Sequence, residues 1–390
     1  MQRDHDIIII GGGMVGAALA ARLGKSGRRV ALIERDQPPT APEGDFDLRI
    51  SSLNQRSLDF IDASATQLPL ERTASFRHIE VCNQEGTGHS LFSARDSDME
   101  RFGLFIENAA LQHALWQRLK SLPSVTLYTD TTLVATFASG QARTVELDNG
   151  QTLSAELVVG ADGANSKLRE LAGIDIATHD YRQRAMIINV ETERPQQDVS
   201  WQCFTPHGPL AMLPLPGHRA SLVWYDTPDA TRAREALDDD ALIHAIEAAF
   251  PKRLGGITRV VARASFPIKR QHARSYTAKR LALMGDAAHV VHPLAGQGLN
   301  IGLHDADTLA EQILKHVDAG DPTALSRYEW QRRLANQAMI AATDGFHHLF
   351  TGAKPLRQLG DFSLHLAERL PLAKRLMMRQ ANGFSPFKGR

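Results

Sequence analysis

Cysteine is scarce in this chain of 390 residues: only Cys82 and Cys203 occur, and neither belongs to a Cys-x-x-Cys pair. The sequence therefore gives no sign of a disulfide framework, a zinc site or a thiol redox centre, and two structurally buried cysteines are expected. Net charge is missing as well, since Lys plus Arg and Asp plus Glu both number 44. Without surplus positive charge, no nucleic-acid partner is indicated.

Long apolar runs are also missing. No uninterrupted apolar stretch approaches the roughly 18 residues of a membrane span. Residues 1–6 carry acidic charge and lead into a short apolar run and then glycines, unlike a secretory signal. The sequence predicts a cytoplasmic protein that could touch the inner membrane peripherally. There is no low-complexity segment or internal repeat, and the length favours about two domains.

The chain opens with a strand, a helix and a second strand. Residues 7–10 predict a buried strand, residues 14–25 a helix rich in small side chains, and residues 30–33 the next strand. Two further apolar strands end in turns, over residues 156–163 and 281–286. The sequence therefore predicts an α/β domain whose strands end at candidate functional turns.

Glycines occupy the first of these turns. Gly11, Gly13 and Gly16 follow a strand and open a helix, so backbone amides there can approach a pyrophosphate near the positive helix N-terminus. Glu34 ends the next strand, about 20 residues after Gly11, where a carboxylate accepts hydrogen bonds from an adenosine ribose. Together these residues predict dinucleotide binding.

A second turn of this kind lies far along the chain. Asp286 follows Gly285 at the end of a strand, where its carboxylate can meet a ribityl hydroxyl. Residues 296–298 precede a helix whose N-terminal amides could stabilise negative charge on a reduced flavin, unless they form an ordinary helix start. Two such turns suggest one long cofactor held at both ends, which favours FAD over a nicotinamide nucleotide alone.

A third turn, over residues 162–169, is ambiguous. Asp162 or Ser166 could simply cap a helix, or the segment could lie between flavin and nicotinamide. No second GxGxxG follows a strand, so a separate nicotinamide-binding domain is not expected and the reductant must bind in a cleft. Arg49 fits either a surface cation or a cofactor contact. The histidines show no metal-ligand spacing and there is no G-x-S-x-G elbow, so no metal is assigned.

The middle of the chain predicts a different kind of domain. Residues 186–193 and 209–225 alternate apolar and polar side chains, as in an antiparallel sheet, and residues 236–249 predict a helix. From residue 299 the pattern is helical, with breaks at 321–322, 354–355 and 370–371. We expect a discontinuous cofactor domain over residues 1–75, 100–180 and 265–345, a β-rich substrate domain over 76–99 and 181–264, and a C-terminal helical appendage over 346–390.

The order of the three turns resembles that in FAD-dependent aromatic hydroxylases of the para-hydroxybenzoate hydroxylase type. More narrowly, the chain resembles the ubiquinone-biosynthesis hydroxylases, the UbiH/UbiF group, over nearly its whole length. That closer resemblance is carried by residues 102–108, 159–166, 204–215 and 285–305. It implies a Rossmann-like FAD-binding domain of the GR2/PHBH type, with an inserted mixed or antiparallel β-sheet substrate domain and C-terminal helices. Residues 54–57 depart from the family pattern, which leaves the packing after Arg49 open.

The motifs and the resemblance together imply a set of FAD-binding residues. They are Gly11, Gly13, Met14, Val15, Gly16, Glu34, Arg35, Arg49, Asn108, Asp162, Gly285, Asp286, Pro293, Gly296, Gln297, Gly298, Leu299 and Asn300. No catalytic residue is assigned. Tyr225, His207 and His292 are candidates for a base that deprotonates a ring hydroxyl.

The activity that the resemblance implies is ring hydroxylation of a polyprenyl phenol or quinol. NADPH or NADH reduces the flavin, O2 adds to it, and one oxygen atom of the C4a-hydroperoxide enters the ring. Residues 223–226 and 266–267 favour the demethoxyubiquinol step. Another ring position in the same pathway and a non-catalytic flavin- or quinone-binding subunit remain alternatives. So does an isoprenoid reductase, whereas no Trp-x-Trp pair of a flavin halogenase is present.

The C-terminal helices are expected to form a basic amphipathic surface that meets anionic lipid, or else to pack on the core. Other proteins of the biosynthetic complex and a second copy of the chain are further possible partners. The residues proposed for the lipid surface are Leu364, Leu366, Leu370, Leu372, Leu376 and Met377, flanked by Arg369, Lys374, Arg375 and Arg379.

Overall fold

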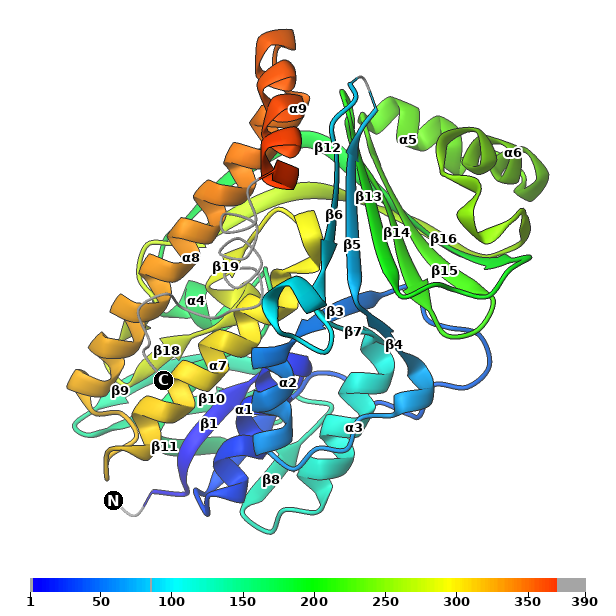
Figure 1. The fold of residues 1–390 in the computed structure, drawn as a ribbon. Helices are drawn as coiled ribbons and strands as arrows, with labels where there is room; N and C mark the ends of the chain where they lie inside the picture. The colour runs from blue at the N-terminus through cyan, green and yellow to red at the C-terminus, as the bar shows by residue number, and fades with distance from the viewer. Residues whose placement is uncertain (1–2, 85, 370–390) are drawn as a thin grey trace.

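A parallel sheet forms the base of the molecule in the computed structural model, which describes residues 3–84 and 86–369 (Figure 1). Its parallel strands lie in the order β18, β11, β1, β2 and β8. Their bounds are Leu281–Leu283, Thr152–Gly160, His5–Ile10, Val30–Ile33 and Val125–Tyr128. The edge strand β17 (Thr277–Ala278) and the hairpin of β9 (Leu133–Ser139) and β10 (Ala142–Leu147) extend it. The predicted strands are confirmed.

Helices pack against this sheet and bury its apolar strands. They are α1 (Met14–Lys25), α3 (Asn108–Lys120), α7 (Gly298–Leu314) and the short α4 (Lys167–Leu171). The small side chains of α1 let it contact both α3 and α7 closely. Helix α2 (Gln55–Ala63) and a three-stranded sheet of β3 (Ile50–Asn54), β7 (Gly103–Glu107) and β4 (Thr73–Phe76) lie beside them.

A second, eight-stranded sheet stands above the first (Figure 1). Every neighbouring pair in it is antiparallel except β13 and β5. In order, its strands are β19 (His289–Val290), β16 (Ile257–Ala273), β12 (Ile176–Thr192), β15 (Arg219–Asp226), β14 (Gly208–Leu215), β13 (Val199–Thr205), β5 (His78–Asn83) and β6 (His89–Ser93). The predicted antiparallel sheet is confirmed.

Helices α5 (Pro228–Glu235) and α6 (Asp239–Ala249) cover the outer face of this sheet. Met186, Ile188 and Leu222 point toward α6 and pack with its Leu242 and Ile246. The helix predicted from residue 236 begins three residues later because the Asp238 side chain accepts a hydrogen bond from Ala241 N–H at 2.8 Å.

The two sheets are joined by continuous backbone. Strands β12 and β16 each run for 17 residues, and their pairing shifts register between Asp180 and Arg184. Both predicted boundaries near residues 181 and 265 fall inside these strands, so the chain passes from one layer to the other without a linker. The boundary at residue 346 likewise falls inside α8 (Pro322–Thr351).

The C-terminal helices begin where the sequence predicted breaks. Helix α8 starts at Pro322 after an Asp321 cap, and α9 (Lys354–Arg369) starts three residues after α8 ends. The third break, at 370–371, lies outside the described residues. Within residues 3–84 and 86–369, no helix is both long and apolar enough to cross a membrane.

The two cysteines are paired, and the prediction of no disulfide is wrong. Cys82 on β5 lies directly opposite Cys203 on β13, with a Cα–Cα distance of 4.5 Å, and the two form a disulfide. They are 121 residues apart in the sequence, and neither belongs to a local motif. Only the strand register brings them together.

Candidate active site

The three predicted turns meet at one edge of the parallel sheet. They follow β1, β11 and β18, which are adjacent parallel strands, so their carboxyl ends share that edge. A Cβ atom at Gly11 would lie 2.4 Å from the Ala161 oxygen, and one at Gly285 would lie 3.5 Å from Val15. The glycine turn therefore contacts both of the other turns.

Each glycine of the first turn meets a different spatial constraint. Gly11 has φ +104°, and a Cβ at Gly16 would lie 2.0 Å from the Gly11 oxygen, so both positions need glycine. A Cβ at Gly13 would instead meet no described atom within 4 Å. No described side chain caps the first turn of α1. This open helix N-terminus fits a pyrophosphate.

Glu34 is held in place beside this turn. Its Oε2 accepts a hydrogen bond from Gly12 N–H at 2.5 Å, and its Oε1 accepts one from Asp36 N–H at 3.1 Å. Trp116 Nε1–H donates to the Gly12 oxygen at 2.8 Å and fixes the turn from α3. Each carboxylate oxygen keeps a lone pair for a ribose hydroxyl. The Arg35 side chain points into solvent, being 76% exposed.

Asp162 makes the helix-capping contact that was one of the two roles the sequence left open. Its Oδ2 accepts a hydrogen bond from Leu168 N–H at 3.1 Å, as a helix cap does, while its Oδ1 is buried without a partner among the described residues. Asn108 Oδ1 is likewise buried and unpartnered in the described structure. The Asn108 N–H donates to the Arg49 oxygen at 2.9 Å. Buried acceptors without a partner fit contact with a hydroxyl-rich cofactor.

The Asp286 side chain keeps contact with solvent, but the surrounding protein atoms partly desolvate its carboxyl. This desolvation raises the pKa of its carboxyl, whereas the charges of His289 and Arg49 oppose the shift. Arg49, itself exposed, is therefore near enough to act electrostatically on Asp286. The structure brings these two predicted residues together.

A buried polar network behind Asp286 has no counterpart in the sequence prediction. Asp305 on α7 is fully buried and accepts hydrogen bonds from Gly285 N–H at 3.0 Å and Arg332 Nε at 2.7 Å, and it pairs with His289. Asn336 Nδ2 donates to it at 3.1 Å. Burial alone would raise the pKa of Asp305, but His289 and Arg332 outweigh it and hold that pKa far below its usual range.

Residues 54–57, which depart from the family pattern, contact the start of α7. Asn300 Oδ1 accepts hydrogen bonds from Asn54 N–H at 2.9 Å and Ser57 Oγ at 2.7 Å, and its Nδ2 donates to the Ser52 oxygen at 2.8 Å. The oxygen and nitrogen of the Asn300 side chain thus already have hydrogen-bond partners within the protein. Its backbone amide is the group left to bind a cofactor. No described side chain caps this helix start.

The loop before α7 carries the remaining predicted residues. Leu294–Gly296 forms a 3-10 turn after Pro293, and Gly296 has φ +62°. A Cβ at Gly298 would meet no described atom within 4 Å. Like Gly13, this glycine therefore leaves space beside a helix N-terminus, as a cofactor cradle would need.

The pattern of the FAD binding domain family matches residues 4–343. Over 386 residues the chain is 39% identical to the 3-demethoxyubiquinol 3-hydroxylase of Escherichia coli (strain K12), with 97% of this chain and 98% of that protein covered. The chain belongs to the FAD-dependent ubiquinone-biosynthesis hydroxylases. It is also 36% identical to the ubiquinone hydroxylase UbiL of Rhodospirillum rubrum, covering 97% of this chain and 89% of that one.

Solved structures share the fold of this hydroxylase family member. The p-nitrophenol 4-monooxygenase PnpA from Pseudomonas putida DLL-E4 has a TM-score of 0.82 at 18% identity, with 100% of both chains covered. A single-substitution variant of HpxO from Klebsiella pneumoniae, complexed with FAD, has a TM-score of 0.76 at 18% identity, covering 98% of this chain and 100% of that one. The predicted fold, an FAD-binding domain with a second β-sheet, is confirmed, and the protein is an FAD-dependent monooxygenase.

Two of the three candidate bases of this monooxygenase lie together. The rings of Tyr225 and His292 are stacked with centroids 5.7 Å apart, whereas His207 is exposed on the turn between β13 and β14. Burial raises the pKa of the Tyr225 phenol well above its usual value and lowers the pKa of His292 to about 3. Both side chains are therefore neutral near pH 7: the Tyr225 phenol keeps its proton, and the His292 imidazole is only a weak base.

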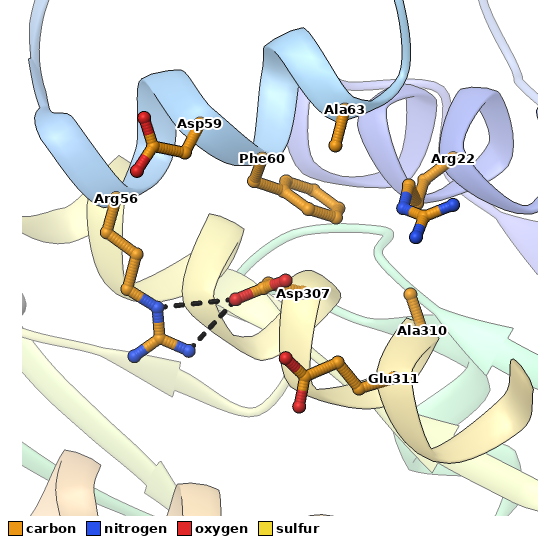
Figure 2. A pocket seen from close by; sticks show the side chains of 8 residues that line it. All are labelled: Arg22, Arg56, Asp59, Phe60, Ala63, Asp307, Ala310 and Glu311. Carbon is orange, nitrogen blue, oxygen red and sulfur yellow. Dashed lines mark hydrogen bonds and ion pairs between the residues drawn. The ribbon is translucent and has the colours of Figure 1, made fainter. Parts of the chain in front are cut away.

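A hollow of about 270 Å³ lies between α1, α2 and α7, and none of the predicted cofactor residues lines it. Figure 2 shows the side chains that do. Arg56 on α2 donates to Asp307 on α7 at 3.0 Å across it. Arg56 belongs to the segment that departs from the family pattern, and this pair gives it a partner on α7. It joins α2 to α7. The hollow is lined by Arg22, Arg56, Asp59, Phe60, Ala63, Asp307, Ala310 and Glu311.

Proposed function

We propose that this protein hydroxylates 2-polyprenyl-3-methyl-6-methoxy-1,4-benzoquinol, the demethoxyubiquinol step, with O2 and with NADPH or NADH as reductant. The similarity to the Escherichia coli 3-demethoxyubiquinol 3-hydroxylase over 97% of the chain carries the proposal. Hydroxylation at another ring position of the same pathway is the alternative reaction. A non-catalytic quinone-binding subunit is the alternative role, and the experiment below separates both.

The residues at the edge of the parallel sheet suit one flavin nucleotide. We assign the ribose to Glu34, the pyrophosphate to the amides after Gly13, the ribityl chain to Asp286, and the pyrimidine side of the ring to the amides of Gly298 and Leu299. When bound, FAD supplies the redox chemistry of reducing and activating O2. The protein's own task is to hold the cofactor and substrate and to exclude water.

The inner face of the second sheet suits the substrate ring. Side chains alternate along a strand, so the face opposite α6 carries Ala185, Ile187 and Val223, with Tyr225 beside them. These groups are mainly apolar, and the sheet places them on the side of His292, on which Tyr225 stacks. His292 directly precedes residues 293–297, the loop before α7 that we call the flavin loop. An apolar wall there would keep water from the reacting groups.

Helix α9 suits contact with the membrane in which a polyprenyl quinol resides. Leu356, Leu359 and Phe362 are 43%, 55% and 60% exposed. Asp361 accepts a hydrogen bond from the N–H of Gly88, the residue before β6, at 2.6 Å. We propose that this exposed face meets lipid peripherally. Leu364, which was predicted on that surface, is instead 7% exposed and packs with Phe204 and Phe350, while the side chains from residue 365 onward lie outside the described ones.

Flotation with vesicles tests the membrane contact. Wild-type holoenzyme should float with vesicles that contain anionic lipid, and Phe362→Glu should remain in the lower fraction because a carboxylate resists transfer into the interface. Equal flotation of both proteins would contradict the contact. Assembly with other biosynthetic proteins or with a second copy remains a proposal that size-exclusion chromatography can examine.

Turnover assays test the main proposal. Purified holoenzyme is mixed with the demethoxy quinol, NADPH or NADH, and ¹⁸O2, and the expected product carries one labelled oxygen at the free ring position. The absence of a hydroxylated product from every quinol of the pathway would refute hydroxylation. The absence of quinol-stimulated oxidation of the reductant would in addition favour a binding subunit. A product labelled at another ring carbon would support the alternative reaction.

The cofactor assignment has a separate test that needs no turnover. Asp286→Ala should purify with little FAD, because it removes the carboxylate assigned to the ribityl chain. Asp307→Ala, a matched aspartate at the hollow of Figure 2, should keep its flavin. Full flavin occupancy in Asp286→Ala would contradict the assignment.

A further inference from the structure

His292 lies among aromatic side chains directly before Pro293 of the flavin loop. Its side chain has no solvent exposure. The ring of Tyr225 is stacked on it, with an interplanar angle of 14°, and the edge-on ring of Tyr181 lies 4.7 Å away between centroids. The ring of His347 on α8 lies 5.1 Å away. Strands β12 and β15, helix α8 and the flavin loop thus converge on one imidazole.

The hydrogen bond at Nδ1 determines which nitrogen carries the proton. Leu294 N–H donates to His292 Nδ1 at 3.3 Å, so Nδ1 is the acceptor and the neutral imidazole holds its proton on Nε2. Nε2 is buried and has no hydrogen-bond partner among the described residues. Most buried N–H groups in folded proteins have an acceptor, so Nε2–H is a candidate donor to a bound molecule.

The titratable groups around His292 do not supply that acceptor. The Asp344 carboxylate accepts from the Tyr181 hydroxyl and pairs with Arg270, and His347 is a second imidazole. Burial, followed by the neighbouring His347, lowers the pKa of His292 to about 3, although Asp344 opposes the shift. The burial of Tyr225 keeps its phenol protonated. His292 is therefore neutral over the working pH range, and its lowered pKa makes it a weak base.

We propose that His292 donates a hydrogen bond from Nε2–H to a ring oxygen of the bound phenol or quinol. This inference rests on the proposed function and names a residue that would recognise its substrate. A fixed donor stabilises a phenolate oxygen more than a hydroxyl oxygen. When the ring O–H bond breaks, its proton passes to solvent water, the electron pair stays on the oxygen, and His292 keeps its own proton. The ring becomes richer in electrons and more reactive toward an electrophilic oxygen.

A chromogenic phenol gives a readout that is independent of turnover. The probe is 2-prenyl-4-nitrophenol, whose phenolate absorbs visible light, titrated on holoenzyme by difference spectroscopy. His292→Phe keeps an aromatic ring against Tyr225 but removes the donor. It should raise the pKa of the bound probe by at least about one unit, a tenfold change in its ionisation equilibrium. His292→Gln, which keeps an N–H donor, should recover most of this shift.

The control is His347→Phe, which alters packing around His292 without removing its Nε2–H. It should leave the pKa of the bound probe near the wild-type value. The inference is overturned if His292→Phe and wild type give the same pKa for the bound probe, because water or an aromatic face would then satisfy Nε2. It is also overturned if wild-type holoenzyme does not bind the probe at all.

Two further outcomes keep this inference separate from the proposed function. A wild type that ionises the probe but hydroxylates no quinol refutes the function alone. If His292→Phe does not retain FAD, NMR of ¹⁵N-histidine-labelled wild type replaces it. The Nε2 signal of His292 should then shift when the probe binds, with Nε2 still protonated, and an unchanged signal would overturn the inference.

Discussion

Replacing Asp305 by Asn tests whether the buried network behind the Gly285–Asp286 turn maintains the fold. Asparagine keeps the shape of the side chain and removes its charge. Asp305 has no exposure and pairs with Arg332, which is itself only 6% exposed. The substitution therefore leaves a guanidinium buried without its anionic partner, and it weakens the acceptor for Gly285 N–H.

The expected loss is large because the remaining charge stays buried. Removing one partner of a buried ion pair costs about 3–5 kcal/mol. A typical domain unfolds with about 5–15 kcal/mol, so Asp305→Asn should lose a substantial part of its unfolding free energy. Asp307→Asn is the matched control on the same helix. Its pair with Arg56 is about one-quarter exposed, so a loss of at most about 1 kcal/mol is expected.

Urea unfolding of both variants, followed by tryptophan fluorescence at fixed FAD concentration, measures the difference. Saturating FAD must be the same for all samples, because a ligand that binds the folded state adds to its stability. If Asp305→Asn unfolds within about 1 kcal/mol of wild type, the network does not carry the stability assigned to it. Equal losses in the two variants would also refute the reasoning, since burial is what distinguishes them.

The pH dependence of stability gives an independent check on Asp305. Its pKa in the folded protein is lowered, whereas the unfolded chain has the ordinary value of about 3.9. The unfolded state thus takes up the proton first as pH falls. The contribution of Asp305 is complete above about pH 4 to 5 and is lost as pH falls below the unfolded pKa toward the folded one. The stability gap between wild type and Asp305→Asn should narrow in that range.

Other predictions concern the glycine turn, its carboxylate and the disulfide. Gly13→Ala should fold normally but bind FAD more weakly, whereas Gly11→Ala should reduce soluble yield, because its Cβ would lie 2.4 Å from a backbone oxygen at a φ of +104°. Glu34→Gln should weaken FAD binding, measured by equilibrium dialysis, because an amide nitrogen replaces one acceptor. Alkylation of unreduced, denatured protein should modify neither Cys82 nor Cys203 in mass spectra, and removing the disulfide by a double Ala substitution should destabilise the protein by up to about 4–5 kcal/mol.

Local sequence patterns were sufficient for the strands and turns around the cofactor. Gly11, Gly16 and Glu34 act over short stretches of chain, so their spacing alone predicts the turn that the structure contains. The alternating pattern of residues 209–225 likewise predicts a hairpin of exposed and buried faces. These features depend on backbone geometry and on which face of a strand is apolar. Both can be inferred from the sequence of a single short segment.

Long-range pairing could not be read in this way. Cys82 meets Cys203 only through the register of β5 and β13. The partner of Arg332 lies 27 residues earlier on another helix. The proton position of His292 depends on the amide of Leu294, and its surroundings are rings from three other elements. Each depends on tertiary placement, for which a single sequence carries no local signal.

Helix α7 explains why the segment that resembles the family extends from Gly285 to residue 305. Asn300 at its start holds β3 and α2, and Asp305 further along holds the amide of Gly285. Between them, a Cβ at Gly302 would lie 2.8 Å from Val15 and 3.3 Å from Gly285, so glycine allows α1 and the turn to approach together. One helix thus fixes three segments that are distant in the chain. A shift of α7 would displace all three, so substitutions on its buried face should alter flavin binding without touching the flavin.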